Sequence, residues 1–363
     1  MSLVLEDVSV RQRREFWLRD VNLELHSGMT TLIGPTLAGK TTLMRVVAGL
    51  HPPNAGRVVV NGEDVTAISV RKRSVGFVYQ QFINYPSLSV YENIASPLRL
   101  AADFPKIKID QRVREVAELM GIETLLRRKP SELSGGQQQR TAIARALARP
   151  VDVLLLDEPL ANLDYKLREQ LRADLKTMFR DSPGIVLYST ADPAEALSFA
   201  APTVVLGEGR VLQVGDAALM YDAPPTLAVA ATLSDPPLNL LPGVVSDGRI
   251  ECLGTSFPAP GAHASGRHVT LGVRPHQVRI TRGGPDDLEF PGQVRVAEVT
   301  GSATFLHLLL AGGRHLVAEL SGTQRFTPED PATAYVDPRH IFVFDQVGGR
   351  LLAQSATEVE LRG

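Results

Sequence analysis

Gly34-Pro35-Thr36-Leu37-Ala38-Gly39-Lys40-Thr41 is the stretch of sequence that decides the fold of this chain. It matches the pattern GxxxxGK[ST], in which backbone N–H groups and the start of the next helix surround phosphate groups. We expect Lys40 to reach the β- and γ-phosphate oxygens and Thr41 to ligate Mg²⁺. The stretch therefore predicts a nucleotide site.

The segments on either side of this loop have the order that a phosphate loop requires. Residues 30–33 are expected to form a strand, and the apolar residues between Leu43 and Leu50 have the spacing of one helix face. Residues 153–156 are all apolar and predict a strand buried on both faces of a parallel sheet, followed by a helix over 167–179. The sequence therefore predicts an α/β domain, into which residues 88–150 insert a helical subdomain.

Two acidic residues, Asp157 and Glu158, follow the second predicted strand. At this place we expect Asp157 to hold Mg²⁺ through water and Glu158 to polarise the water that attacks the γ-phosphate. The alternative is that the two acids only cap the next helix, which is common. The presence of Lys40 in the same sequence favours the catalytic interpretation.

A second glycine-containing stretch opens a predicted helix at residues 133–140. Its Ser134, Gly135, Gly136 and Gln137 offer a hydroxyl and closely approachable backbone N–H groups at the positive end of that helix. An N-capped helix with a glycine-rich start is the simpler alternative. That alternative leaves unexplained why a second anion site accompanies the phosphate loop.

Composition limits the class of protein. The chain has 363 residues, a net charge of −2 and a single cysteine, Cys252, so it has no basic field for nucleic acid and no internal disulfide. Residues 1–10 lack the basic start and apolar run of a secretion signal. The longest apolar runs fall far short of the ~20 residues that span a bilayer. We therefore expect any membrane role to depend on partner chains.

The composition changes near residue 235, where proline and glycine begin to separate short apolar runs. Strands at roughly ten-residue spacing predict a small all-β barrel. The expected domains are residues 1–235 and 236–363. The expected strands of the second domain include residues 269–273, 294–299, 305–310, 315–320 and 341–344.

At this point the chain resembles the ATP-binding-cassette (ABC) transporter ATPases over nearly its whole length. Gln80 matches the glutamine loop of that family, and residues 160–164, Leu-Ala-Asn-Leu-Asp, match its aspartate loop. The second domain is similar to the OB-type (TOBE) barrels of carbohydrate importer ATPases, in the motifs Pro-Leu-Asn at 237–239, Gly-Val-Arg-Pro at 272–275 and Asp-Pro-Arg-His at 337–340. Residues 34–40, 79–86 and 188–190 look like those of glycerol importer ATPases.

The resemblance implies an ATPase that uses ATP and Mg²⁺ at the cytoplasmic face of a bacterial or archaeal plasma membrane. Its implied partners are a second ATPase subunit, two permeases and an extracytoplasmic solute-binding protein, with no nucleic acid. The segment that follows Gln80, near Phe82 to Tyr91, would pass the closure of the ATPase subunits to the permeases. Ser134 to Gln137 would act on the partner's ATP, and Glu158 would be catalytic. The implied Mg²⁺ ligands are Thr41, Gln80 and Asp157. The implied ATP-binding residues are Gly34, Pro35, Thr36, Leu37, Ala38, Gly39, Lys40, Thr41, Thr42 and Gln80.

Three departures from the family pattern fall in this chain's own ATP site. Ala191 stands where the family usually has a histidine that binds the γ-phosphate, and no histidine lies between His51 and His263. In the loop expected over residues 10–14, Gln12 replaces an aromatic residue that stacks on adenine. Phe16 or Trp17 either substitutes for it or is an ordinary strand residue. Leu37 replaces a glycine, so it either accepts a strained left-handed conformation, at about 1–2 kcal/mol, or changes the loop's path.

These departures suggest a heterodimer in which this chain's own ATP site is slow. The signature residues of this chain, Ser134 to Gln137, would then complete a faster site on another ATPase. A homodimer that works through Glu158 is the rival, with Ser189, Thr190 or Asp192 supplying a weaker phosphate contact. A mainly regulatory, nucleotide-gated subunit is a third hypothesis. A soluble ABC protein acting on ribosomes or DNA fits poorly with the acidic balance, the single cassette and the barrel.

Overall fold

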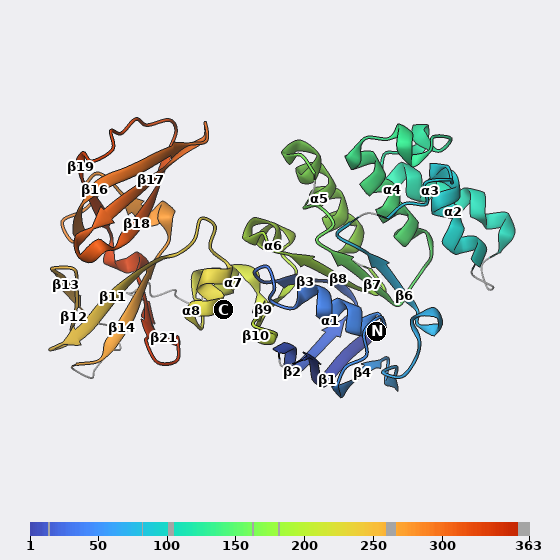
Figure 1. Ribbon diagram of the computed structural model, residues 1–363, viewed down its shortest axis with the longest axis horizontal. Helices are drawn as coiled ribbons and strands as arrows, with labels where there is room; N and C mark the ends of the chain where they lie inside the picture. The colour runs from blue at the N-terminus through green and yellow to red at the C-terminus, as the bar shows by residue number, and fades with distance from the viewer. Residues whose placement is uncertain are drawn as a thin grey trace, which may run out of the picture. The chain divides into compact units, whose positions relative to one another are not determined.

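The computed structural model describes residues 1–13, 15–81, 83–100, 105–161, 163–180, 182–258 and 266–354. It divides into two compact units, Met1–Ala217 and Ala218–Gly363 (Figure 1). The sequence analysis placed residues 218–235 in the first domain, whereas their helix α8 (Leu227–Thr232) packs in the second unit, where Leu227 and Ala230 join a core with Phe342 and Phe344.

The first unit is built on a mainly parallel sheet with the strand order β10-β9-β3-β8-β7-β6. Only the pair β9–β10 is antiparallel. Along β7, Val153 and Leu155 pack in one core while Leu154 and Leu156 pack in another, so the strand is buried on both faces as predicted. The strands are β3 (Gly28–Ile33), β6 (Val75–Val78), β7 (Val153–Asp157), β8 (Ile185–Thr190), β9 (Pro202–Gly207) and β10 (Arg210–Asp216).

A second, antiparallel sheet covers helix α1 (Lys40–Val47) from the other side. Its order is β2-β1-β4-β5, with β1 (Ser2–Gln12), β2 (Glu15–His26), β4 (Ala55–Val60) and β5 (Glu63–Asp64). Leu43, Met44 and Val46 of α1 are fully buried in the core that the two sheets share. The helix ends at Val47, one turn before the limit at Leu50 that periodicity indicated, and Gly49 has a positive φ of 74°.

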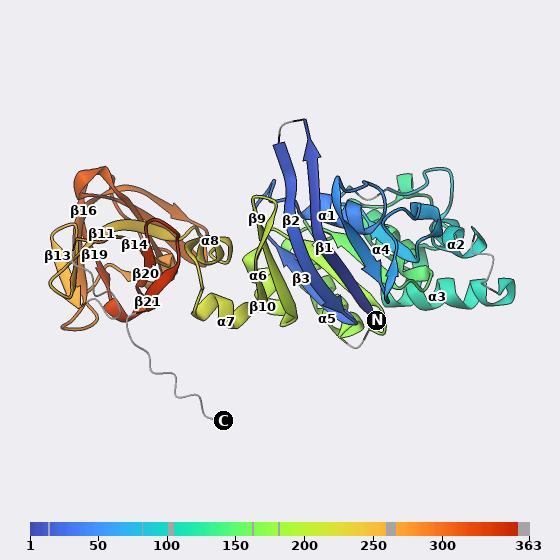
Figure 2. The same ribbon diagram turned by 90° about the horizontal axis from the view of Figure 1, so that it is seen from below.

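Helices occupy most of the chain between β6 and β7. They are α2 (Val90–Leu100), α3 (Ile109–Leu119) and α4 (Gly135–Ala148), and Figure 2 shows them together at one end of this unit. Helices α5 (Tyr165–Phe179) and α6 (Pro193–Phe199) follow β7 and β8. Short 3₁₀ turns lie at Val70–Lys72, Lys106–Lys108, Glu123–Leu125 and Pro130–Glu132. These helices share one core with the outer face of β7 and β8.

The second unit consists mainly of two antiparallel sheets that enclose one apolar core, as a near-closed barrel (Figure 1). The prediction of an all-β barrel after the α/β domain is confirmed. One sheet contains β13 (Thr255–Pro258), β12 (Arg249–Cys252), β11 (Asn239–Ser246), β14 (His268–Val273), β20 (Phe342–Asp345) and β21 (Leu351–Gln354) in that order. The other contains β15 (Val278–Arg279), β19 (Pro331–Val336), β16 (Leu288–Val299), β17 (Ala303–Leu310) and β18 (His315–Ser321).

Two buried polar side chains join the parts of the second unit. Asn239 of β11 exchanges hydrogen bonds with the backbone of Val317 in β18, at 2.9 and 2.7 Å, and so ties one sheet to the other. The Arg274 guanidinium lies 3.3 Å from the centroid of the Tyr221 ring and donates to the Tyr221 carbonyl at 2.6 Å. Arg274 therefore holds helix α7 (Ala217–Asp222) on the barrel. Further 3₁₀ turns lie at Pro275–Gln277, Ala311–Gly313 and Pro338–His340.

Candidate nucleotide-binding site

The phosphate loop connects the end of β3 to the start of α1, and two of its glycines are required by close packing. A Cβ atom on Gly34 would lie 2.3 Å from the carbonyl oxygen of Leu206. Gly39 has φ of 104°, and a Cβ there would lie 2.7 Å from the carbonyl oxygen of Trp17. No other residue type fits either position without moving the backbone.

Leu37 adopts the left-handed conformation, with φ of 70°, and its side chain is 97% exposed. Of the two alternatives that the sequence left open, the loop therefore keeps its path and accepts the strain. The exposure explains why this is sterically tolerated, because the side chain meets nothing that would push the loop aside. The strain itself costs about 1–2 kcal/mol.

The Lys40 ammonium is buried at the mouth of the loop. It donates hydrogen bonds to the carbonyl oxygens of Gly34, at 2.6 Å, and Pro35, at 3.1 Å. It also forms an ion pair with Glu158 Oε1 at 3.2 Å, and the Lys40 side chain is only 4% exposed. Gln80 Nε2 donates to the other oxygen of Glu158 at 2.9 Å. The predicted lysine, glutamate and glutamine are thus brought together by three separate segments.

Asp157 joins the loop to β8. Its Oδ2 accepts from the Thr41 hydroxyl at 2.8 Å and its Oδ1 accepts from the Ser189 hydroxyl at 2.8 Å. The Ser189 hydroxyl also accepts from the backbone N–H of Glu158 at 3.0 Å. Ser189 therefore positions the acidic pair, a role that the sequence analysis did not assign to it. This role of Ser189 follows from the pairing of β7 with β8 in the sheet, which the sequence pattern does not show.

The grouping of Thr41, Gln80 and Asp157 fits a magnesium ion. These side chains supply a hydroxyl, an amide and a single carboxylate, and Mg²⁺ in nucleotide sites takes oxygen ligands, usually one or two carboxylates beside phosphate and water. Among the described residues no group of three or more His, Cys, Asp and Glu side chains could hold a metal. The donor set therefore suits a metal that arrives with phosphate oxygens rather than one held by the protein alone.

A cavity of about 580 Å³ opens beside the loop. Its lining includes Phe16 and Trp17 of β2 together with Leu37, Lys40 and Glu158. Phe16 is 41% exposed and Trp17 37%. Both residues are in a strand, as one alternative predicted, and both also border the nucleotide cavity. The segment that the sequence analysis treated as a loop, residues 10–14, is strand as far as Gln12, and Arg14 lies outside the described residues.

The signature residues begin helix α4. The Ser134 hydroxyl accepts from the Gln137 N–H at 3.4 Å, and the Gln137 side-chain oxygen accepts from the Ser134 N–H at 3.0 Å, which is a capping box. The simpler alternative of an N-capped helix is thus structurally correct. Ser134 and Gly135 are nevertheless exposed, and a Cβ on Gly135 would meet nothing within 4 Å. The start of this helix is therefore accessible to a ligand.

The segment after Gln80 is attached to the signature helix. Asn84 Nδ2 donates to the carbonyl oxygen of Gln138 at 2.7 Å, and the Arg145 guanidinium lies 4.9 Å from the Tyr85 ring centroid. Phe82, also part of the expected permease-facing segment, lies outside the described residues. The contacts from Asn84 and Tyr85 connect the glutamine loop to α4, and no sequence motif predicted these contacts.

The position of the missing histidine is exposed. Ala191 follows β8 directly and is solvent-accessible, whereas Ser189 and Thr190 are 0% and 3% exposed. Asp192 is half-buried and accepts from the Ala194 N–H at 2.8 Å as the cap of α6. In the aspartate loop, Asp164 accepts from the Leu167 N–H at 3.0 Å, and Asn162 lies outside the described residues. Of the alternative phosphate contacts, only Asp192 is accessible, and its charge would repel phosphate.

Comparison with known proteins places these features in a family. The chain matches the family described as ABC transporter over residues 18–161, the TOBE domain over 271–344 and the CysA C-terminal regulatory domain over 239–280. It is 36% identical to the trehalose/maltose import ATP-binding protein MalK of Thermococcus litoralis, over 92% of this chain and 95% of that protein. It is 35% identical to the sn-glycerol-3-phosphate import ATP-binding protein UgpC of Paracoccus denitrificans, over 96% and 98% respectively.

A solved structure supports the fold of the first unit. A dimeric ATP-binding cassette in a post-hydrolysis state, bound to ADP and Pi, superimposes with a TM-score of 0.54 and 28% identity. The matched region covers 59% of this chain and 98% of the chain of the solved structure.

Leu37→Gly tests the strain in the phosphate loop. Glycine removes the cost of the left-handed conformation but loses more backbone entropy on folding, so we expect a net stabilisation of about 0.5–1 kcal/mol. Denaturant unfolding of the first unit measures it. Leu37→Ala is the matched control, because it shortens the side chain and keeps the Cβ atom. Equal stabilities of the two variants would contradict strain at this residue.

Phe16 and Trp17 are expected to contact the base of a bound nucleotide. Trp17 is the only tryptophan of the chain, so ATP should change its fluorescence, and titration gives the dissociation constant. We expect Phe16→Ala to weaken ATP binding by about three- to tenfold, the loss of one aromatic contact. Gln12→Ala, on the same hairpin, should leave binding unchanged. An effect of Gln12→Ala equal to that of Phe16→Ala would show that the aromatic ring is not the cause.

Proposed function

Because this chain belongs to the ABC transporter ATPases that carry a C-terminal TOBE domain, we propose that it is the ATP-hydrolysing subunit of an importer for a sugar, polyol or glycerol-type solute. The observation that carries the proposal is the cluster of Lys40, Gln80, Asp157 and Glu158 beside the phosphate loop. The import proteins to which the chain is about 35% identical along nearly all of its length support the solute class.

The proposed partners follow from the class of importer. They are a second ATPase subunit, two permeases and an extracytoplasmic solute-binding protein, with this chain bound to the permeases at the cytoplasmic face of the membrane. Among the described residues, no helix is both long and apolar enough to cross a bilayer. Asn84 and Tyr85 are well placed to transmit movement between the ATP site and the permeases, because they join the glutamine loop to α4.

The proposed chemistry starts from the ion pair between Lys40 and Glu158. A γ-phosphate bound by Lys40 competes for the same ammonium, and this competition releases Glu158 to orient a water molecule. Thr41, Gln80 and Asp157 are the residues that would hold Mg²⁺, which would neutralise phosphate charge when bound. Glu158 is the proposed catalytic residue, and Ser189 is a positioning residue.

We further propose that this chain's own site turns over slowly. Ala191 cannot donate a hydrogen bond to the γ-phosphate, and the neighbouring hydroxyls of Ser189 and Thr190 are buried and engaged. The outward-facing signature, Ser134 to Gln137, is complete. The favoured assembly is therefore a heterodimer in which this signature completes the faster site of another ATPase.

Two alternatives remain within the same class. A homodimer active through Glu158 is supported by the intact contacts of Lys40, Gln80 and Glu158. A mainly regulatory subunit would bind nucleotide at the phosphate loop and close without hydrolysis. Purification separates them, because a homodimer hydrolyses ATP without a second ATPase and a regulatory subunit hydrolyses none in any assembly.

The asymmetry is tested by reconstituting the transporter with Glu158→Gln in this chain. We expect transport to persist at a substantial fraction of the unmodified rate, because the faster site is the one that holds the partner's ATP and does not contain Glu158. The matching substitution in the second ATPase should abolish transport. If Glu158→Gln in this chain abolishes transport and the matching change does not, the proposed asymmetry is reversed.

Ala191→His is the complementary experiment. Restoring a donor to the γ-phosphate should raise ATP hydrolysis at this chain's own site by at least about tenfold, since one such donor is commonly worth 10²–10³ in rate. Single-turnover hydrolysis measures it. Ala194→His, at an exposed position of α6, is the matched control. Equal rates for Ala191→His and the unmodified chain would show that the histidine position does not limit the rate.

A further inference from the structure

Arg73 lies beside the last turn of α1, at the end of that helix that faces away from the phosphate loop, and directly before β6. Its half-buried side chain donates four hydrogen bonds, all to backbone carbonyl oxygens. The acceptors are Val46 at 3.1 Å, Val47 at 2.7 Å, Thr66 at 3.1 Å and Ile68 at 2.9 Å. A guanidinium has five N–H groups, so Arg73 spends most of its donors on the backbone.

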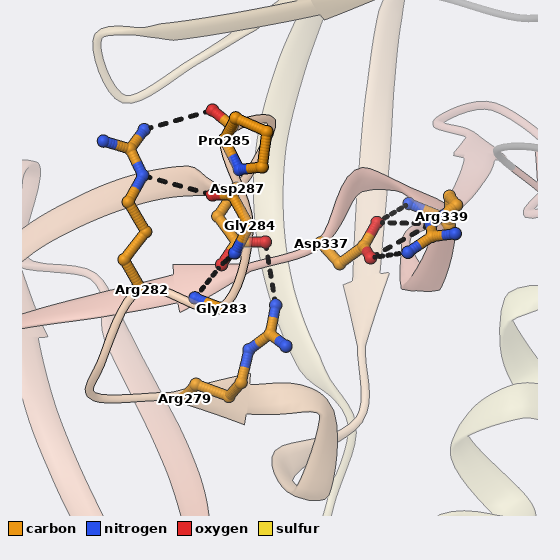
Figure 3. A network of polar contacts seen from close by, with 8 residues as sticks. All are labelled: Arg279, Arg282, Gly283, Gly284, Pro285, Asp287, Asp337 and Arg339. Carbon is orange, nitrogen blue, oxygen red and sulfur yellow. Dashed lines mark hydrogen bonds and ion pairs between the residues drawn. The ribbon is translucent and has the colours of Figure 1, made fainter.

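This use of an arginine differs from that in the second unit. There Arg279 donates to Asp287 at 2.8 Å, and Arg339 donates to both oxygens of Asp337 (Figure 3). In the part of the chain that the structure describes, Arg73 forms no ion pair with a carboxylate, and burial lowers its pKa. Carbonyl groups are therefore its hydrogen-bond partners, and its position is tied to the backbone segments that it joins.

Two of these carbonyl groups end α1. The last carbonyl groups of a helix have no partner within the helix, and the helix dipole stabilises a positive charge there. Gly49 leaves room for this charge, because a Cβ atom on it would lie 2.6 Å from Arg73 Nε. Helix α1 has eight residues and is about 12 Å long. The position of its last turn therefore also sets the position of Lys40 and Thr41 at its start.

The next residue, Ser74, fixes the start of another strand. The Asp152 N–H donates to the Ser74 hydroxyl at 3.0 Å and to the Ser74 carbonyl oxygen at 3.1 Å. From this point β6 and β7 pair in parallel, and they lead to Gln80 and Asp157 respectively. Arg73 and Ser74 thus connect three elements at one end, and the other ends of the same elements meet at the phosphate loop.

A cavity of about 240 Å³ lies at this junction. Val47, Arg73, Ser74 and Asp152 are among its lining residues. Because space remains here, packing alone does not fix the distance between the end of α1 and the start of β6. The hydrogen bonds of Arg73 bridge that distance.

We propose that Arg73 is a positioning residue of the ATP site. It sets α1, which carries Thr41, at a fixed distance from β6 and β7, which lead to Gln80 and Asp157. The inference rests on the proposed ATPase function, because these three residues are the ones that would hold Mg²⁺. Arg73 acts through the elements that it joins, whereas a residue that only capped α1 would affect stability alone.

ATP binding by the full-length chain, with and without Mg²⁺, tests the proposal. Calorimetric titration gives the two dissociation constants, and the factor by which Mg²⁺ tightens ATP binding reports how well the metal ligands are arranged. We expect Arg73→Gln to reduce this factor by about tenfold, as the loss of residues that orient metal ligands commonly does. Binding without Mg²⁺ should be nearly unchanged, because Lys40 stays bonded to the loop carbonyls.

Arg112→Gln is the matched control. Arg112 is also half-buried and donates to the last carbonyl oxygens of α4, those of Leu147 at 2.8 Å and Ala148 at 3.0 Å. It does not line the nucleotide cavity. Both substitutions should lower the thermal midpoint, by about 2–4 °C for the loss of one helix cap. Only Arg73→Gln should reduce the Mg²⁺ factor.

Arg73→Lys separates charge from geometry. Lysine keeps a positive charge at the end of α1, but its compact ammonium cannot reproduce the planar fork that reaches four carbonyl groups. We expect this variant to recover most of the thermal midpoint while the Mg²⁺ factor stays low. It also serves as the test if Arg73→Gln is too unstable to titrate.

Three results would overturn the inference. The first is an unchanged Mg²⁺ factor in Arg73→Gln at a lowered thermal midpoint, which is the behaviour of a purely stabilising cap. The second is an equal reduction of the factor in Arg112→Gln. The third is its full recovery in Arg73→Lys, which would assign the effect to charge alone. Absence of ATP binding by the unmodified chain would instead contradict the proposed ATPase function on which the inference rests.

Discussion

The arrangement of the elements around the ATP site of the first unit depends on the position of the buried Lys40 ammonium. Two carbonyl oxygens of the phosphate loop and the carboxylate of Glu158 surround this charge, and a buried charge without such partners would cost several kcal/mol. The requirement fixes the loop, the start of α1 and the end of β7 relative to one another. Asp157 extends the same constraint to β8 through Ser189, and Gln80 extends it to the segment that reaches α4.

Local pattern predicted what depends on local chemistry. Residues 153–156 indicated a strand buried on both faces, and Gly34 to Thr41 indicated a strand, turn and helix, because these signals lie in composition and short spacing. The hydrogen bond from Ser189 to Asp157 was not predictable in this way, since it depends on which strands are neighbours in the sheet. The bond from Asn84 to Gln138 likewise joins segments 54 residues apart. Strand β19, with alanine, threonine and proline, carried too weak a pattern to be expected.

The departures from the family pattern at Leu37 and Ala191 differ in their physical consequences. Leu37 costs conformational energy but projects into solvent, so the loop and the Lys40 contacts survive the change. Ala191 leaves the backbone after β8 intact but removes a donor, and no neighbouring hydroxyl is accessible to replace it. Structure is therefore preserved at both positions, whereas only the second would affect a contact with the reacting phosphate in the function proposed above. This difference is the reason for placing the asymmetry in catalysis rather than in folding or binding.

The two units use similar parts to opposite effect. In the phosphate loop, Lys40 lies at the mouth of a glycine turn, and in the proposed mechanism a bound phosphate would displace its partner Glu158. In the second unit, the N–H groups of Gly283 and Gly284 are already taken by Asp287, and the guanidinium groups of Arg282 and Arg339 already have carboxylate partners. A turn whose donors are consumed internally cannot bind an anion.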